Sequence, residues 1–158
     1  MALFDRETDP QKERDGVALD FGEYRVTLRR QGGANDRYQA ELEKESKPYR
    51  SAAAAGVLTA GKADEIAYRA FARACVVKWE TLASTLPVNA AAGLVMNDLV
   101  ASDGFALGID MRGELVPCNE ENLVAVFTAL PGVFLDLREA ARGEQLFRLK
   151  QREDDAGN

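Results

Sequence analysis

The residues best suited to chemistry lie in the segment GVLTAGKADE, residues 56–65. Here Gly56, Gly61 and Lys62 have the spacing of a phosphate-binding loop. Such a loop wraps phosphates with backbone N–H groups at its glycines, and a Ser or Thr after the lysine holds magnesium. Ala63 occupies that last position, and no β-branched or aromatic strand precedes Gly56. We therefore expect a glycine-containing link ahead of a long helix, and no cofactor.

Acidic residues form a second group of possible ligands, because carboxylate oxygens are what Ca²⁺ and Mg²⁺ prefer. Five of them fall around a predicted turn and the helix that follows it: Asp103, Asp110, Glu114, Glu120 and Glu121. Their spacing matches no ligand loop, and a solvated turn followed by the first turn of a helix accounts for them. Glycoside hydrolysis by paired carboxylates would need aromatic platforms, and the chain has one Trp. We expect no metal site.

The usual nucleophilic and acid–base groups are scarce. The chain has no histidine, which removes the commonest general base and the commonest metal ligand. Cys75 and Cys118 have no Cys or His at zinc-ligand spacing, and we expect both to be thiols, with Cys75 buried and Cys118 near a turn. These features predict that the protein is not an enzyme and has no catalytic residue.

Composition narrows the class of protein further. The chain has 158 residues, 46% hydrophobic and 29% charged, which suits one globular domain. Its net charge of -6 argues against a nucleic-acid partner, since phosphate binding draws on clustered Lys and Arg. No signal peptide and no membrane-length apolar run is evident, so we expect no membrane partner and an intracellular location.

The elements that must position these residues begin after a charged segment. We expect a flexible N-terminal arm at 1–16, a single mainly helical domain at 17–150 and a flexible acidic tail at 151–158. Alternating apolar residues predict an edge strand within 17–33. A helix should follow over 36–47, capped by Asn35.

Residues 62–82 show the strongest helical pattern in the chain. Two apolar stripes at helical spacing predict a central helix with Phe71 and Trp79 buried against the C-terminal helices. Residues 83–109 are rich in Ala, Leu and Val and broken by glycines, and their pattern leaves helix followed by strand and irregular structure both open.

The last third of the chain has clearer boundaries. Residues 110–118 predict a small hairpin with its turn at Arg112 and Gly113. Asn119 should cap a helix, and Pro131 should begin another. The expected fold is therefore mainly α, of the α+β class: a helical domain with an N-terminal strand and a small β-hairpin.

Apolar residues crowd the C-terminal helices more densely than one face of two short helices readily hides. Two interpretations stay open: all of them pack on the long helix, or some contact another molecule. On the second interpretation we predict a partner-binding or self-association surface at Phe134, Leu137 and Phe147.

Several short blocks occur in an order that resembles the tail assembly chaperones of long-tailed, siphovirus-type bacteriophages. They are GGAND followed by RY (32–38), KWE (78–80), RGELVP (112–117), EEN (120–122), PGVFLDLREAA (131–141) and a late Phe147. Each block is short, and their order carries the resemblance over most of the chain. The stretch at 82–110 is longer and more apolar than in proteins of that kind.

The resemblance implies a helical, non-enzymatic protein that binds the phage tape measure protein and helps recruit the major tail protein. It implies a location in the host cytoplasm during assembly. A structural component of the tail or neck, retained in the virion, would explain the same composition.

Overall fold

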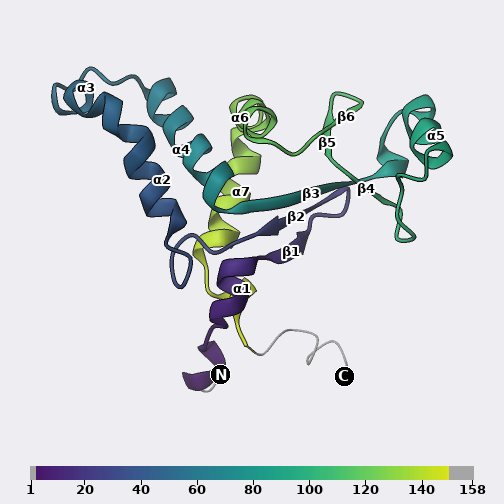
Figure 1. Cartoon of the computed structure of the whole chain (residues 1–158), viewed down its shortest axis with the longest axis horizontal. Coiled ribbons are helices and arrows are strands. Elements are labelled where there is room, and N and C mark those ends of the chain that lie inside the picture. The colour runs from purple at the N-terminus through teal and green to yellow at the C-terminus, as the bar shows by residue number, and fades with distance from the viewer. Residues whose placement is uncertain (1–2, 150–158) are drawn as a thin grey trace.

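The computed structural model describes residues 3–149 and has the predicted α+β fold (Figure 1). The α-helices are α1 (Pro10–Asp15), α2 (Arg37–Ser46), α3 (Arg50–Ala54), α4 (Ala60–Ala74), α5 (Val88–Met96), α6 (Glu120–Ala129) and α7 (Pro131–Arg142). The strands are β1 (Val17–Asp20), β2 (Tyr24–Leu28), β3 (Val76–Leu82), β4 (Phe105–Leu107), β5 (Ile109–Met111) and β6 (Glu114–Val116). Short 3₁₀ turns lie at Leu3–Arg6, Lys47–Tyr49, Ala83–Thr85 and Gln145–Phe147.

The first four strands form one antiparallel sheet in the order β1-β2-β3-β4. Val26 pairs with Trp79 on the face that is buried, and Arg25 pairs with Glu80 on the opposite, more polar face. An antiparallel sheet commonly has this division into a core face and a solvated face. The sheet therefore offers one apolar side to the helices.

Helices α4 and α6 lie on the side of the sheet opposite α1, and α7 runs from α6 down past the sheet toward α1 (Figure 1). Phe71 of α4 makes edge-to-face contacts with Phe127 of α6 and Phe134 of α7, with ring centroids 6.2 and 5.4 Å apart. Val26 and Leu28 join the same cluster from the sheet. The core thus lies between the sheet and these three helices.

The predicted helix over 62–82 is wrong beyond residue 74. Helix α4 ends at Ala74, and the chain continues as the central strand β3, which pairs with β2 and β4. Val76, Trp79 and Thr81 point into the buried side, while Val77 is exposed. β-Branched and aromatic residues favour a pleated, half-buried surface, and pairing on both sides overrides the helical spacing.

Residues 3–16, predicted to form a flexible arm, instead pack onto the domain. Asp9 caps α1 by accepting from the Gln11 amide at 2.9 Å, and its own amide donates to the Phe147 carbonyl at 2.8 Å. Glu13 is buried and pairs with Arg30. The charges of this segment therefore make specific contacts that composition alone does not reveal. The predicted tail at 151–158 lies outside the described residues.

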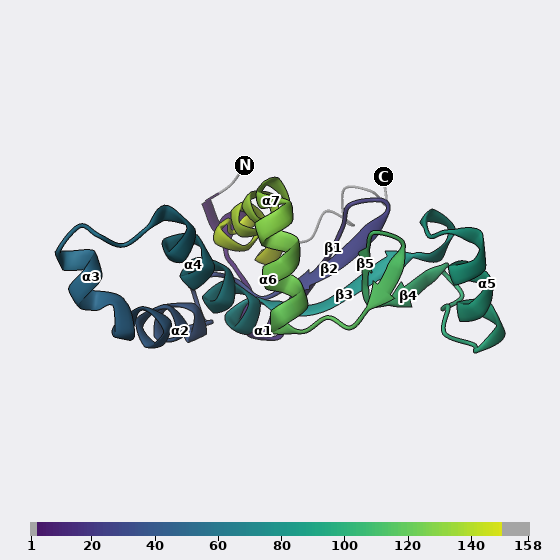
Figure 2. The same cartoon turned by 90° about the horizontal axis from the view of Figure 1, so that it is seen from above.

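Residues 83–109 contain helix α5 and strand β4, which resolves the open prediction for this stretch as helix followed by strand. The predicted hairpin at 110–118 is confirmed as β5 and β6, and Arg112 and Gly113 both have positive φ, 56° and 93°. Seen from above, the molecule is elongated, with α3 at one end and α5 at the other (Figure 2).

Candidate partner-binding surface

An open groove of about 640 Å³ lies over the sheet, between helices α6 and α7 and the β5–β6 hairpin. Tyr24 and Trp79 contribute from the sheet, Met111 from the hairpin, and Leu130 and Val133 from the junction of α6 and α7. Ligand grooves of this kind are mostly apolar with a few polar groups at the rim. Glu23, Asp110 and Arg112 supply the charged groups that line this one.

Stacked aromatic rings run along the sheet beside this groove. Phe21 stacks on Tyr24 with ring centroids 4.8 Å apart, and Tyr24 stacks on Trp79 at 5.0 Å. Burial, assisted by the charge of Asp136, raises the pKa of Tyr24, so its phenol stays neutral at physiological pH. Trp79 is only 4% exposed, so the half-buried ring of Tyr24, packed on Trp79, supplies most of the aromatic contact area on this side of the groove.

The hairpin is fixed as the far wall of the groove by a close approach at Gly108. Its amide donates to the Trp79 carbonyl at 2.9 Å, and its carbonyl accepts from the Thr81 hydroxyl at 2.8 Å. Gly108 has φ of 132°, and a Cβ there would lie 2.8 Å from the Val116 carbonyl oxygen. Only glycine suits both the backbone conformation and the space.

The predicted partner-binding residues do not line this groove. Phe134, Leu137 and Phe147 are 4%, 0% and 0% exposed, so the core explains them and they are not available as surface anchors. Phe134 packs among Tyr68, Phe71 and Phe127. The exposed apolar side chains at this end of the molecule are Leu130 and Leu135, 56% and 57% exposed.

Sequence reasoning missed Leu130, Val133 and Met111 as surface residues. Leu130 and Val133 lie in the same apolar-rich segment as the buried Phe134, and no spacing in the sequence separates them. Leu130 ends exposed because it lies at the junction between α6 and α7, where it is the last residue before Pro131. The groove forms only because the hairpin lies opposite α6 in the folded chain, and a pattern of neighbouring residues does not show this arrangement.

Residues 55–59 link α3 to α4, as predicted, and Gly61 and Lys62 lie in the first turn of α4, which begins at Ala60. The Thr59 hydroxyl accepts from the Lys62 amide at 3.2 Å and so caps α4. The Lys62 ammonium contacts Glu65 at 3.0 Å and lies 4.7 Å from the centre of the Tyr49 ring. Hydrogen bonds with Tyr49 and Glu65 raise the pKa of Lys62. The lysine is thus engaged within its own helix and neighbouring turn.

The acidic residues of the sequence are dispersed rather than converging. Asp103 pairs with Arg25 at 3.0 Å, and Asp110 accepts from the Gly113 amide inside the hairpin at 2.7 Å. Glu120 and Glu121 pair with arginines of α4. Within residues 3–149, no group of three or more His, Cys, Asp or Glu side chains is arranged to hold a metal ion.

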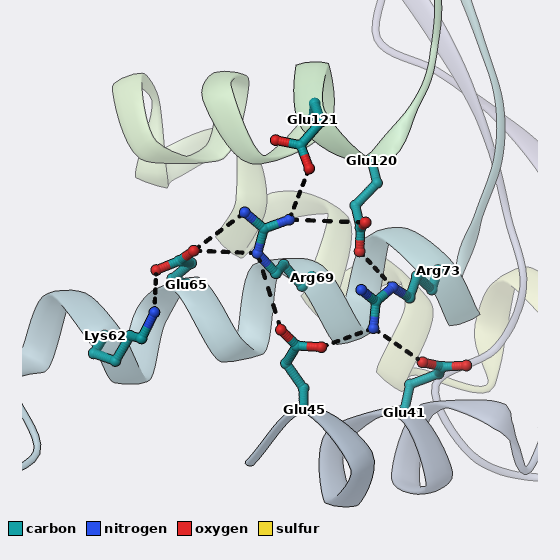
Figure 3. A network of polar contacts seen from close by, with 8 residues as sticks. All are labelled: Glu41, Glu45, Lys62, Glu65, Arg69, Arg73, Glu120 and Glu121. Carbon is teal, nitrogen blue, oxygen red and sulfur yellow. Dashed lines mark hydrogen bonds and ion pairs between the residues drawn. The ribbon is translucent and has the colours of Figure 1, made fainter. Parts of the chain in front are cut away.

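Those arginines form the centre of a polar network between three helices (Figure 3). Arg69 reaches Glu65 at 3.2 Å within α4 and Glu121 of α6 at 3.0 Å. Arg73 reaches Glu45 of α2 at 2.8 Å and also pairs with Glu120 of α6. The network joins α2 to α4 beside the contact of Tyr38 with Phe71, whose ring centroids are 6.5 Å apart. It supports the helices and lies apart from the groove residues.

Replacing Arg73 with methionine should destabilise the protein by about 1 kcal/mol at low salt, because a partly exposed ion-pair network contributes about that much. This loss of stability should be smaller at about 1 M salt, because the Debye length there is only about 3 Å and the ion pairs are screened in the wild type as well. Thermal unfolding at both salt concentrations measures it. Arg50→Met, the same change at an exposed position of α3, is the control. Equal effects of the two substitutions would contradict the role of the network.

Besides the groove, helix α5 presents a second group of exposed apolar side chains. None of its residues is buried, and Val88, Val95 and Met96 are all exposed. Leu99 after the helix is exposed as well. A surface helix normally buries an apolar stripe, and α5 buries none within this chain.

A group of ion pairs centred on Arg25, here called the Arg25 clamp, joins the sheet to the segment that follows α5. Arg25 makes two hydrogen bonds to Glu80, at 2.8 and 3.0 Å, and a third to Asp103 at 3.0 Å. Its guanidinium also lies 4.1 Å from the centre of the Phe105 ring. Strands β2, β3 and β4 are thereby tied together where the chain leaves for α5 and returns.

This clamp should make stability depend on acid pH. The hydrogen bonds from Arg25 hold the pKa of Glu80 below its usual 4.5, so the ionised form favours the folded state. That contribution is complete above about pH 4.5 and is lost as pH falls through the lower, folded-state pKa. Melting temperatures from pH 7 to 3 should fall less steeply for Glu80→Gln than for the wild type. Parallel curves would contradict the clamp.

Both cysteines are thiols, as predicted. Burial raises the pKa of Cys75 to about 12, which leaves it protonated and unreactive at neutral pH. Burial also raises the pKa of Cys118, which is half-buried. Among the described residues, no helix combines the length and the apolar character needed to span a membrane.

Comparison with known proteins gives one match. A family model described as YdaY prophage protein matches residues 33–158, well over half of the chain. No curated protein and no solved structure matches it.

Proposed function

Since the chain belongs to the YdaY prophage protein family and is of phage origin, we propose that it is a tail assembly chaperone of a long-tailed phage. In this role it binds the tape measure protein and helps recruit the major tail protein during tail assembly. The order of short sequence blocks described above supports the same class. The work would take place in the host cytoplasm.

One observation carries the proposal: the open groove between α6, α7 and the hairpin. On the sheet side it has half-buried Tyr24 packed on buried Trp79, and Leu130 is an exposed apolar residue at its rim. An amphipathic helix docks by placing apolar anchors, spaced along one face, into such a groove. A tape measure protein is expected to be a long amphipathic helix, which gives it repeated anchors of that kind.

The negative net charge of the chain is consistent with a chaperone that stays soluble after it leaves its partner. The net charge of -6 keeps separate copies soluble and favours repulsion between them at most surfaces. The proposed activity is binding without chemistry: the chain acts without cofactor or catalytic residue.

The groove is tested by co-purification with the tape measure protein of the same phage. Leu130→Glu should reduce the amount of tape measure protein recovered by about tenfold, because loss of an interface anchor often costs more than 1 kcal/mol. Leu135→Glu is the matched control, since Leu135 is equally exposed but does not line the groove. Both variants should keep the wild-type melting temperature. Equal recovery with both variants would contradict the proposal.

A structural component retained in the virion is the second candidate. The exposed apolar side chains of α5 favour it, because a permanent neighbour would cover them. Mass spectrometry of purified particles separates the two roles. A chaperone should be absent from the particle, whereas a tail component should be present in fixed ratio to other tail proteins.

A further inference from the structure

Helix α5 projects from the domain and has no buried residue. It extends beyond the sheet at the end of the molecule opposite α3 (Figures 1 and 2). Its end is closed locally: the Leu99 amide donates to the Leu94 carbonyl at 2.9 Å and the Asp98 amide to the Val95 carbonyl at 3.1 Å. Asp98 adopts the left-handed conformation that this C-terminal motif requires, with φ of 56°.

The segment that leads from α5 back to β4 is also held by specific contacts. The Ala101 amide donates to the Phe105 carbonyl at 2.8 Å, and Asp103 is held by Arg25. Helix α5 is therefore fixed at both ends while its side chains Val88, Val95 and Met96 lie in solvent. A fixed apolar helix without an internal partner is suited to contact another molecule.

Charge indicates which molecule. No ionisable side chain occurs from residue 81 to 97, and no Lys or Arg occurs between Lys78 and Arg112. Anionic membranes and nucleic acids are bound through Lys and Arg, which this surface lacks. A surface that binds a basic protein would carry carboxylates around its apolar side chains. Helix α5 has no carboxylate, so it is not suited to a basic partner. Two copies of a chain with net charge -6 repel each other, and an uncharged helix lets them meet without opposing like charges.

We propose that two copies of this chain associate through α5, in a symmetric contact that packs the two helices antiparallel. A two-fold contact uses the same surface on both copies. Antiparallel packing places Asp98, at the C-terminal end of α5, beside the N-terminal end of the partner's helix, where the helix dipole favours a carboxylate. Parallel packing would instead bring the two Asp98 side chains together. Ala92, one turn from both Val88 and Val95, is the small residue exposed on this face, and it allows the helix axes to approach closely.

Sedimentation velocity over a range of protein concentrations tests this contact. The wild type should sediment as a monomer–dimer mixture that shifts to dimer at higher concentration. Val95→Glu should weaken dimerisation by at least about tenfold, since it places a charge inside the contact. Val57→Glu is the matched control: it adds the same charge at an equally exposed valine, 68% against 65%, near the other end of the molecule. It should dimerise like the wild type.

Circular dichroism should show both variants folded, because neither valine is buried. A second variant, Met96→Glu, should act like Val95→Glu. A wild type that remains monomeric at every concentration would overturn the proposal. So would dimers that persist equally in Val95→Glu and Val57→Glu. Loss of tape measure co-purification in Val95→Glu, with a monomeric wild type, would assign the surface to that partner and overturn it too.

Discussion

Replacing Phe71 with alanine should lower the free energy of unfolding by about 3–5 kcal/mol, which is enough to unfold a marginal domain. Phe71 is fully buried at the centre of the aromatic cluster, where α2, α6 and α7 each contribute a ring. Its removal leaves a cavity that the surrounding rings cannot fill without losing their edge-to-face geometry. Urea unfolding, followed by circular dichroism, measures the change.

The matched control is Phe4→Ala. Phe4 lies in the N-terminal 3₁₀ turn and is 81% exposed, so the same substitution should change the free energy of unfolding by less than about 0.5 kcal/mol. The comparison separates burial from residue type. If the two variants unfold at the same urea concentration, the cluster is not the centre of the core.

The second large effect is expected at Glu13, whose replacement by alanine should cost about 2–4 kcal/mol. Glu13 is 3% exposed and pairs with Arg30, which is itself largely covered. Removing one member of a buried pair leaves the other charge without compensation. The neighbouring Gly33 underlines how closely the site is packed, because a Cβ there would collide with the Glu13 carboxylate.

A double-mutant cycle separates the pair from general damage to α1. Arg30→Met added to Glu13→Ala should recover part of the lost stability, because the unpaired charge is then gone. If the two changes are simply additive, the pair contributes little, and the cost of Glu13→Ala comes from lost packing of α1.

The parts of the fold that sequence could predict are those with strong local determinants. Asn119 accepts from the Asn122 amide at 2.9 Å and caps α6, and Pro131 begins α7. Arg112 and Gly113 make the turn of the hairpin. These features depend on neighbours within a few residues, which a sequence displays directly.

The strand β3 and the docking of α1 depend on distant segments instead. The spacing of Tyr68, Cys75 and Trp79 suits a helix, but β2 and β4 supply the pairing that makes residues 76–82 a strand. Glu13 is an ordinary surface residue by sequence, and its burial depends on Arg30 and the Ala34 amide, which contact its carboxylate. Neither partner lies close enough along the chain to be inferred from pattern.

The sequence shows an excess of apolar residues near the C-terminus. The three residues that we predicted from it as partner-binding, Phe134, Leu137 and Phe147, are buried. Phe134, Leu137 and Ala141 lie at helical spacing on the core-facing side of α7, whereas Leu135, identical in type to Leu137, lies off that face and is 57% exposed. A better indicator was present elsewhere: the uncharged run at 81–97. The exposed part of this run, helix α5, is the surface that we propose for self-association.

The single tryptophan of the chain provides the most direct measurement of the central claim, because Trp79 lines the groove. Its fluorescence should be followed during titration with tryptophan-free peptides that cover apolar-repeat segments of the tape measure protein. We expect a saturable change in Trp79 emission, with an apparent Kd about tenfold higher for Leu130→Glu than for Leu135→Glu. Peptide that co-purifies with the protein while Trp79 emission stays unchanged at saturation would contradict binding in the groove.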